Sequence, residues 1–597
     1  LEAMLKEGCM SKETVTGVLQ ISASTMKSIL QTGVIREETS QVYRNPVRQR
    51  LDGWQEVCLN DEQMNAVASI WQNAAICREH WSREQGMHLL YGITGSGKTE
   101  VYMALMEKVL NEGRQIIVLI PEISLTLQTV SRFYARFGSQ IAVMNSRLSA
   151  GERYDQYMRA KRGEASIMIG PRSALFTPFD RLGLIIIDEE HESSYKSENS
   201  PRYHARETAI HRAKLEGARV ILGSATPSME AYYRAKEGEY VLVKLEARFE
   251  ERPLPRVSII DMREQLKKGN RLALSLELRE DLSQCLKKGE QAMLFLNRRG
   301  YAGFVSCRSC GHVMKCPHCD VSLSEHNGRK LICHYCGYET VKPDKCPVCS
   351  SPYIGGFKAG TQQIQQVVEK EFPEARVLRM DYDTTRAKGS YEKILSAFSR
   401  HEADILIGTQ MIVKGHDFPD VTLVGILAAD LSLNADDYRS GERTFQLLTQ
   451  AVGRAGRGRK EGHALIQTYS PDHYSIQTAA KQDYEEFYQE EMGYRLLMDY
   501  PPAAHMMAVL GSSEDEKLLE TAMHYLGLFT GKIYAGKDLH VIGPAPASVG
   551  KVKDVYRRVL YLKHENYDLL VRIKDRLEEY IEINSGFRKV NIQFDFS

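Results

Sequence analysis

The sequence predicts an α/β fold with two lobes, each a parallel β-sheet with helices on both faces, and three observations support this prediction. Short apolar runs, typical of buried strands, alternate with helical stretches from about residue 59 to residue 240. A second series of the same kind extends from residue 293 to residue 466. Within the first series, a glycine-rich loop follows one apolar run and opens a helix.

Length and changes of pattern divide the chain into a few units. Its 597 residues correspond to roughly four domains. Short helices precede the lobes, and they predict either a winged helix or a plain three-helix module; charged helices and β-rich segments follow the lobes and predict an α+β domain. The predicted units are a winged-helix-like module (1–50), lobe one (51–240), the first part of lobe two (241–306), a cysteine-rich insertion (307–350), the second part of lobe two (351–478) and the C-terminal domain (479–597).

The predicted strands of the two lobes are apolar runs, because strands of a covered parallel sheet are buried on both faces, and those of the C-terminal domain are β-rich segments. In lobe one these runs are 88–91, 116–120, 167–169, 184–187 and 220–222. In lobe two they are 293–296, 377–380, 405–407, 423–426 and 464–466, and in the C-terminal domain 539–542, 558–562 and 590–594.

Composition excludes several classes of protein. The 78 basic and 77 acidic residues give a net charge of +1, so a nucleic-acid partner would be held by local basic grooves. No run approaches the ~20 apolar residues that span a bilayer, and no signal peptide opens the chain. We therefore expect a cytoplasmic protein without a membrane partner. Because the chain starts at Leu1 inside a helix-like stretch, we also expect that a preceding portion is missing.

Eight of the twelve cysteines form four C-x-x-C pairs within 43 residues. This pattern predicts two structural zinc sites with four thiolates each, closed to other ligands, in a reducing compartment. Spacing alone leaves the grouping of the pairs open. The predicted ligands of the two Zn²⁺ ions are Cys307, Cys310, Cys316, Cys319, Cys333, Cys336, Cys346 and Cys349.

The glycine-rich loop has the sequence of a P-loop, in which backbone N–H groups and a helix N-terminus cradle the phosphates of ATP. Lys98 is expected to reach the β- and γ-phosphates, and the Thr99 hydroxyl to bind Mg²⁺. The loop consists of Gly92, Ile93, Thr94, Gly95, Ser96, Gly97, Lys98 and Thr99.

Two acidic residues end the apolar run 184–187. Acids at a strand end are often solvated turn residues, but after a P-loop we favour a catalytic interpretation. Asp188 would hold Mg²⁺, and Glu189 would orient and deprotonate the attacking water.

Lobe two contributes further candidates for the nucleotide site. Arg454 and Arg457 are expected on one helix face, pointing at the γ-phosphate, although a basic helix facing nucleic acid is an alternative. Gly415 lies in the segment 408–418 and is expected at the nucleotide. Upstream of the P-loop, Gln63 is predicted to read the adenine edge, whereas an isolated Gln is usually a surface residue.

Two segments resemble DNA contacts. In the first, 170–176, backbone amides and Arg172 would approach phosphates. The second follows the acid pair and interleaves aromatic with basic residues, so that tyrosines could stack on unpaired bases while cations hold the backbone. Its alternative is a mobile solvated loop. The candidates in the second segment are Tyr195, Lys196, Arg202 and Tyr203.

In its set of motifs the chain resembles the PriA family of bacterial replication-restart helicases in superfamily 2. These motifs are the P-loop, the acid box 188–191, the Gly-Ser-Ala-Thr-Pro segment 223–227, the segment 408–418, the Gln-Ala-Val-Gly-Arg-Ala-Gly-Arg segment 450–457 and the inserted cysteines. The resemblance implies RecA-like lobes and an ATP-dependent 3′→5′ DNA helicase. Such a protein recognises stalled or abandoned forks, unwinds the lagging arm and starts primosome assembly. Implied partners are forked and single-stranded DNA, the single-stranded DNA-binding protein, and other primosome and helicase-loading proteins.

The resemblance also implies an interleaved zinc arrangement, in which Cys307 and Cys310 share one ion with Cys346 and Cys349, and the four inner cysteines hold the other. Two departures stand out: the family's 3′-end-binding domain does not precede the first module, and Ala503-Ala504-His505 stands where an aromatic residue is expected. Three alternatives remain open: a duplex DNA translocase, a fork-binding scaffold with a nucleotide switch, and an RNA helicase.

Overall fold

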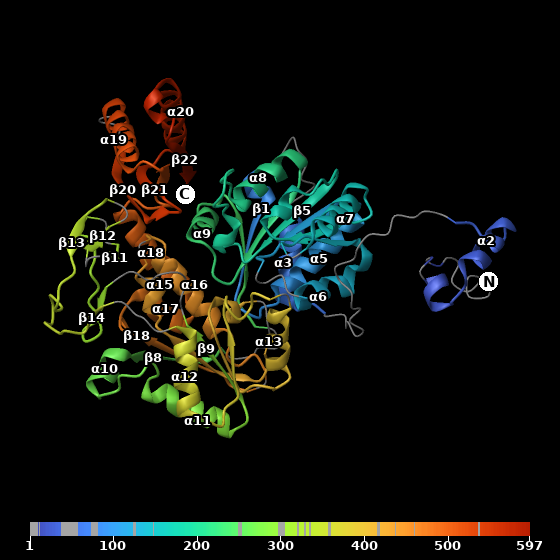
Figure 1. Ribbon diagram of the computed structural model, residues 1–597, viewed down its shortest axis with the longest axis horizontal. Helices are drawn as coiled ribbons and strands as arrows, with labels where there is room; N and C mark the ends of the chain where they lie inside the picture. The colour runs from blue at the N-terminus through green and yellow to red at the C-terminus, as the bar shows by residue number, and fades with distance from the viewer. Residues whose placement is uncertain are drawn as a thin grey trace.

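The structure is a computed structural model of the chain. It describes residues 10, 12, 14–37, 58–72, 81–122, 127–146, 148–248, 254–296, 305–318, 321–326, 330–333, 336–355, 360–387, 389–414, 418–435, 437–458, 460–534 and 538–597. Figure 1 shows two α/β lobes beside each other, with the insertion and the C-terminal domain against the second lobe.

Lobe one contains a seven-stranded parallel sheet in the order β3-β4-β2-β5-β6-β1-β7. The strands are β1 (Met87–Gly92), β2 (Gln115–Leu119), β3 (Ile141–Val143), β4 (Ile167–Gly170), β5 (Leu182–Asp188), β6 (Arg219–Ser224) and β7 (Val241–Leu245). Nearly all residues of the central strands are buried, because helices cover both faces. The carboxyl ends of β1, β5 and β6 therefore meet at one edge, where the candidate site lies.

Helices pack on both faces of this sheet. One apolar cluster includes Val101, Leu105 and Phe133 from α5 and α6, and a second includes Ala209 and Tyr232 from α8 and α9. The helices are α3 (Asp61–Gln72), α4 (Arg83–Gly86), α5 (Lys98–Asn111), α6 (Leu127–Phe137), α7 (Ala150–Lys161), α8 (Ala205–Glu216) and α9 (Met229–Lys236), with short 3₁₀ turns η3 (Gly138–Gln140), η4 (Arg172–Phe176) and η5 (Ser193–Tyr195).

Lobe two repeats the plan with a six-stranded parallel sheet in the order β15-β16-β9-β17-β18-β8. Its strands are β8 (Arg256–Asp261), β9 (Gln291–Leu296), β15 (Val377–Met380), β16 (Ile405–Gly408), β17 (Val421–Leu427) and β18 (His463–Thr468). Its helices are α10 (Met262–Lys267), α11 (Leu276–Lys287), α12 (Thr361–Glu371), α13 (Ser390–Ser399), α14 (Gln410–Val413), α15 (Asp430–Leu433), α16 (Ser440–Val452), α17 (Tyr474–Lys481) and α18 (Tyr484–Leu497).

The cysteine-rich insertion lies between β9 and α12 and consists of short antiparallel strands. These are β10 (Ser306–Cys307), β11 (Ser324–His326), β12 (Lys330–Ile332), β13 (Glu339–Val341) and β14 (Ile354–Gly355). Its apolar residues Val305 and Leu331 share one cluster with Tyr438 of lobe two and with Tyr500 and Met506 near the C-terminal domain. The insertion is therefore packed between these two units.

The C-terminal domain has a four-stranded antiparallel sheet in the order β20-β21-β19-β22, with two long helices packed on it. Its elements are β19 (His505–Ser513), α19 (Glu516–Ile533), β20 (His540–Val552), β21 (Val555–His564), α20 (Tyr567–Ile583), η7 (Ser585–Phe587) and β22 (Asn591–Phe596). Among the described residues, no helix is long and apolar enough to cross a membrane.

The structure confirms the predicted two-lobe α/β fold, with differences at boundaries. β7 pairs with β1, so the sheet of lobe one extends beyond residue 240. β8 joins lobe two ahead of β9, and the insertion therefore follows the second strand of its lobe rather than the first. α17 runs across the boundary placed at residue 478. β7 and β8 were missed because they are edge strands with half-exposed residues, which lack a continuous buried run.

Of the predicted winged-helix-like module, the described residues contain a π-helical turn, η1 (Thr14–Val18), and α2 (Ala23–Gln31). The Ser22 hydroxyl caps α2 by accepting from the Thr25 N–H at 3.2 Å. Its remaining segments lie outside the described residues, so the winged helix stays a prediction.

Candidate nucleotide site between two lobes

The P-loop joins the carboxyl end of β1 to the first residue of α5. Gly95 and Gly97 have φ angles of +86° and +82°, which residues with a side chain rarely adopt. The Lys98 ammonium group donates to the Gly92 carbonyl at 2.7 Å. The loop thus leads into the N-terminus of a 14-residue helix, where free N–H groups favour an anion.

Gln63 lies against this loop and is fully buried. Its Nε2 donates to the Ser96 carbonyl at 3.0 Å, and its Oε1 accepts from the Asn60 N–H at 3.1 Å. A Cβ at Gly97 would stand 2.2 Å from Gln63 Nε2, so glycine is required for this close approach. The adenine contact by Gln63 stays a prediction.

The acid box begins at the carboxyl end of β5. The Tyr102 hydroxyl of α5 donates to Asp188 Oδ1 at 3.0 Å. Gly223 on the adjacent β6 permits this approach, because a Cβ there would stand 1.5 Å from the Tyr102 hydroxyl. Burial, and then the negative charge of Glu189, raise the pKa of Asp188 to about 7. Asp188 is therefore a buried carboxyl group beside a second negative charge.

Glu189 has an unusual conformation and an unsatisfied oxygen. Its φ is +49°, and its buried Oε2 has no hydrogen-bond partner, with His191 Nδ1 lying 3.7 Å away. Burial lowers the pKa of Lys98, whereas Glu189 and Asp188 raise it, so these three charges lie together. Adjacent carboxylates, one with an unsatisfied oxygen, fit a divalent cation, and Asp188 with Thr99 of the P-loop are the side chains that would hold Mg²⁺.

The lobe-two arginines approach the P-loop from the other side, but not from a helix. α16 ends at Val452, and Arg454 and Arg457 follow in the turn beyond it, so the prediction of two arginines on one helix face is wrong. A Cβ on Gly453 would stand 3.3 Å from Thr94 Oγ1 of the P-loop. Arg457, whose Nε donates to the Gly453 carbonyl at 2.9 Å, also lowers the pKa of Lys98. The turn rather than the helix therefore faces the nucleotide site.

A line of three polar side chains crosses from lobe one to lobe two behind the acid box. Ser224 Oγ lies 2.7 Å from His191 Nδ1, and His191 Nε2 lies 2.8 Å from Gln450 Nε2. Ser224 is the last residue of β6, His191 follows β5, and Gln450 belongs to the last turn of α16. The sequence motifs contained all three residues, but no spacing rule indicated that they would meet.

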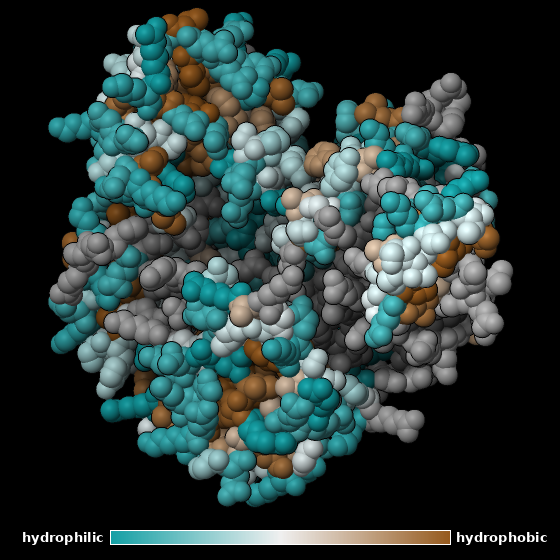
Figure 2. All heavy atoms as spheres, turned by 45° about the vertical axis from the view of Figure 1, so that its right-hand side comes forward, coloured by the Kyte–Doolittle hydropathy of each residue, from teal (hydrophilic) through white to brown (hydrophobic). Residues whose placement is uncertain are grey.

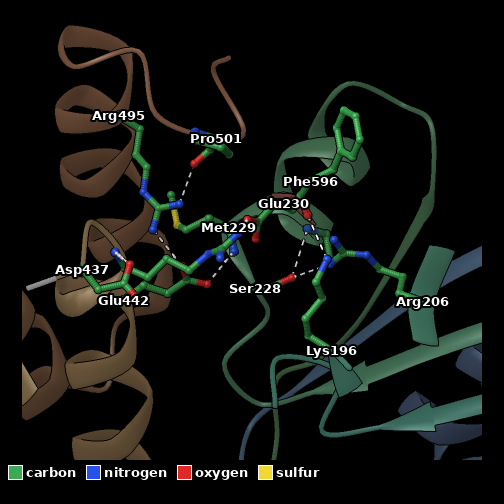
Figure 3. Close-up of polar contacts among 12 residues, drawn as sticks. Lys196, Arg206, Ser228, Met229, Glu230, Asp437, Glu442, Arg495, Pro501 and Phe596 are labelled. Atoms are coloured by element: carbon green, nitrogen blue, oxygen red, sulfur yellow. Dashed lines mark hydrogen bonds and ion pairs between the residues drawn. The ribbon is translucent and has the colours of Figure 1, made fainter. Parts of the chain in front are cut away.

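Buried ion pairs also join the lobes. Lys414 contacts Glu192 across the interface, and both side chains are less than a tenth exposed. Gly415, the next residue, lies outside the described residues, so its predicted nucleotide contact stays a prediction. Figure 3 shows a second junction, in which Glu442 of α16 accepts from the Met229 N–H of lobe one at 3.0 Å and from Arg495 at 2.7 Å.

The segment after the acid box, residues 193–204, is called here the acid-box loop. The Tyr195 side chain is 1% exposed, and its hydroxyl lies 2.7 Å from the Asp188 carbonyl and 3.0 Å from the Leu119 carbonyl. The expectation that Tyr195 stacks on bases is therefore wrong, because the ring has no free face. Arg172 is half-buried and donates to the Ser194 carbonyl at 2.9 Å, and its phosphate contact stays a prediction.

The other candidates in this loop have different surroundings. Tyr203 is half-buried and packs edge-on against exposed Phe176, with ring centroids 5.2 Å apart. Lys196 and Arg202 bind the last strand of the chain rather than standing free in solvent. Their DNA contacts stay a prediction.

The cysteines form two groups of sulfur atoms. Cys307, Cys310, Cys346 and Cys349 lie with all sulfurs within 4.8 Å of one another, and Cys316, Cys333 and Cys336 form the second group. Cys319 lies outside the described residues. Close Sγ pairs are 3.5–3.6 Å apart, too far for a disulfide and near the ~3.8 Å between thiolates around one tetrahedral Zn²⁺. The interleaved grouping is therefore present, and the residues fit zinc.

Backbone turns present these sulfurs. The Gly311 N–H donates to the Cys307 carbonyl at 2.8 Å, and the Gly337 N–H donates to the Cys333 carbonyl at 2.9 Å. Both glycines have positive φ, which the reversal of the chain after each C-x-x-C pair requires.

Four family models match the chain in consecutive segments. They are described as DEAD/DEAH box helicase (62–234), PriA DNA helicase Cys-rich region domain (316–340), Helicase conserved C-terminal domain (354–459) and Primosomal protein N C-terminal domain (497–596).

Proteins named replication restart protein PriA are similar along nearly the whole chain. The Bacillus subtilis protein is 48% identical over 578 residues, covering 96% of this chain and 71% of the relative. The Synechocystis protein is 42% identical, covering 94% and 67%, and the Haemophilus influenzae protein is 37% identical, covering 95% and 77%.

Proposed function

The chain belongs to the PriA family of replication restart proteins, and from this membership we propose a 3′→5′ DNA motor that acts at abandoned forks. The chain is an ATP-dependent DNA helicase of replication restart. The proposal adds polarity, recognition of stalled forks, unwinding of the lagging arm, and the start of primosome assembly. Its partners would be forked and single-stranded DNA, the single-stranded DNA-binding protein, and helicase-loading proteins.

One observation supports the proposal of a motor: the P-loop of lobe one contacts the turn of lobe two that contains Arg454 and Arg457. Thr94 and Gly453 are in contact range, and Arg457 acts electrostatically on Lys98. A nucleotide held by the P-loop would therefore contact both lobes at once, so that its hydrolysis changes how the lobes attract each other. Such a site suits repeated ATP hydrolysis that is coupled to movement of the two lobes.

The side chains have distinct roles in this proposal. Lys98 and the lobe-two arginines Arg454 and Arg457 stabilise charge on the transferring phosphoryl group. Glu189 positions the attacking water and accepts its proton through the carboxylate oxygen that lacks a partner. Asp188 and Thr99 would hold Mg²⁺, which would supply positive charge against the negative charge of the phosphates.

The Ser224–His191–Gln450 line supports a further role for the interface. His191 lies two residues beyond Glu189 and contacts Ser224 of lobe one and Gln450 of lobe two. A movement of one lobe relative to the other would therefore displace the His191 side chain and, with it, the acid box. This is consistent with hydrolysis that depends on lobe closure.

The first test is ATP hydrolysis without nucleic acid and with single-stranded DNA, forked DNA and RNA, for the parent chain and for Lys98→Ala. We expect strong stimulation by forked or single-stranded DNA and a loss of at least about a hundredfold in the variant. Fork binding should survive, because Lys98 contacts phosphate of the nucleotide and not of DNA.

Other outcomes distinguish the alternatives. Stimulation by duplex DNA without strand separation would indicate a translocase, and stimulation by RNA alone would indicate an RNA helicase. Hydrolysis that no nucleic acid stimulates would favour a scaffold with a nucleotide switch. Polarity follows from unwinding of partial duplexes with a single-stranded tail on either the 3′ or the 5′ side.

A further inference from the structure

Two cations of the acid-box loop are held by a single carboxylate from the opposite end of the chain. Lys196 Nζ lies 2.6 Å from Asp595 Oδ1. It also donates to the Phe596 carbonyl at 2.9 Å (Figure 3). Arg202 donates to the other oxygen, Asp595 Oδ2, at 3.1 Å and to Gln593 Oε1 at 3.1 Å. We call Gln593, Asp595 and the Phe596 carbonyl the C-terminal clasp.

The last strand is built to present this clasp. β22 is an edge strand of the C-terminal sheet, paired with β19. Its alternate residues Ile592, Phe594 and Phe596 pack against the core of their own domain. Gln593 and Asp595 point to the other face, because side chains alternate along a strand, and this face meets lobe one.

Partial burial strengthens the clasp. The side chains of Lys196, Arg202 and Asp595 are 28%, 23% and 21% exposed. Fully exposed ion pairs are worth little, but pairs that are partly shielded from water are screened less. Release of the clasp without a replacement anion would therefore be unfavourable.

The other side of the loop is fastened to the nucleotide site. Tyr195, the residue before Lys196, is buried, with its hydroxyl 2.7 Å from the backbone carbonyl of Asp188. Arg172 contacts the carbonyls of Ser194 and Lys196, which fixes the backbone between them. A displacement of Lys196 is therefore transmitted to the strand end that carries the acid box.

The chemistry of the clasp resembles that of a nucleic-acid backbone. A phosphodiester group offers two anionic oxygens, as Asp595 does, and Lys and Arg are the side chains that bind it best. Beside Arg202, the Phe176–Tyr203 pair offers an aromatic surface for a base, since Phe176 is 56% exposed. In the view of Figure 2 the coloured outer surface of the molecule is mainly hydrophilic, with apolar residues in smaller groups.

We propose that Asp595 occupies the place of a DNA phosphate, so that the C-terminal strand and a DNA strand compete for Lys196 and Arg202. With the clasp closed, the loop is held in one position and DNA must displace a carboxylate to bind. With DNA bound, the loop is free to shift and the acid box responds. This inference rests on the proposed function, because it assumes a motor that DNA stimulates.

The test is Asp595→Asn in the full chain, with Asp554→Asn as the matched control. Asp554 carries the same charge in the same domain, but its side chain is 92% exposed and pairs with Lys551. We expect Asp595→Asn to bind a single-stranded oligothymidylate about threefold to tenfold more tightly and to hydrolyse ATP faster without DNA. The control should match the parent chain in both measurements, and the DNA-saturated rate should be similar in all three proteins.

A double-mutant cycle tests whether Asp595 acts through the loop. In a Lys196→Ala background, Asp595→Asn should increase DNA affinity by much less than in the parent chain. An equal gain in both backgrounds would overturn the competition, as would unchanged or weaker DNA binding by Asp595→Asn with a normal thermal unfolding profile.

Failure of the clasp is distinguishable from failure of the proposed function. If DNA stimulates the parent chain but Asp595→Asn behaves like its control, the clasp alone is refuted. If DNA does not stimulate the parent chain, the motor assignment itself fails. Should Asp595→Asn unfold, Gln593→Ala, which removes one contact to Arg202 without a charge change, should show a smaller shift in the same direction.

Discussion

At the scale of single residues, Glu189 combines a left-handed backbone with a buried oxygen that has no hydrogen-bond partner. A left-handed backbone costs a residue with a side chain about 1–2 kcal/mol, and Glu189 adopts it directly after a buried strand. The turn places its carboxylate beside Lys98 and leaves Oε2 without a hydrogen bond. Strain and an unsatisfied buried oxygen at one residue are typical of a group that is positioned for chemistry.

Glu189→Gln keeps the shape of this side chain but removes its ability to accept a proton. We expect ATP to bind with similar affinity and hydrolysis to fall by about a hundredfold to ten-thousandfold, measured in the presence of saturating DNA. Fluorescent-nucleotide binding and steady-state turnover separate the two effects.

The control for this variant is Glu237→Gln, which makes the same change on an exposed turn of lobe one. It should leave turnover unchanged. Rapid hydrolysis by Glu189→Gln would remove Glu189 from the catalytic role and direct attention to Asp188.

At the scale of elements, the cysteine insertion has little secondary structure to hold it together. Its strands are two or three residues long, and its own apolar core is small. Each of the two sulfur groups includes a cysteine pair that is followed by a glycine with positive φ. Metal binding would then supply most of the folding free energy of this unit.

We therefore expect two zinc ions per chain by elemental analysis. Cys346→Ser should retain about one ion, because it removes a ligand from the group that includes Cys307 and Cys349. Cys58→Ser, which changes an exposed cysteine outside both groups, should retain two. One ion or none in the parent chain would refute the double site.

Metal removal should act locally. Because the insertion packs on Tyr438 and Tyr500, chelation should loosen lobe two and the C-terminal domain. Nucleotide binding by the P-loop, which is in lobe one, should persist under the same treatment.

At the scale of the whole molecule, buried ion pairs join units that are far apart in the chain. Glu442 bonds to lobe one through the Met229 N–H and to α18 through Arg495, which also pairs with Glu491 at 2.7 Å. Arg439 and Glu230 form a second contact across the lobes at 2.8 Å. These groups are largely desolvated, so removal of one partner leaves an uncompensated charge or an unpaired N–H group.

Glu442→Gln tests this junction. The free energy of unfolding of the variant should be lower by about 2 kcal/mol. This loss is smaller than that expected when a buried ion pair is fully broken, because Arg495 still pairs with Glu491. We expect a lower first transition in thermal unfolding and slower DNA-stimulated hydrolysis, with little change in nucleotide affinity.

Glu371→Gln is the matched control, since Glu371 pairs with Arg279 within lobe two. It should leave the coupling of DNA binding to hydrolysis intact. Equal effects of both variants would show that Glu442 acts by general stability and not by joining the lobes.

Most of the strands that the sequence predicted in the two lobes are buried on both faces. β5 and β17, for example, read as uninterrupted apolar runs, and the prediction of their positions is confirmed within three residues at either end. β3, which is three residues long, and the edge strands β7 and β8 were not predicted, because a short or half-exposed strand leaves no distinctive pattern. β19 was also not predicted, although it is a mostly buried strand inside the C-terminal sheet.

By itself, the sequence determined the local chemistry of this protein: a phosphate loop after a strand, an acid pair at a strand end, cysteine pairs with zinc spacing, and the two-lobe fold. These features depend on neighbours along the chain, whose geometry is fixed by backbone rules. The tertiary structure alone decided which groups meet. Tyr195 turned inward, while Lys196 found its partner 400 residues away, because the direction of a side chain depends on which surface packs against it.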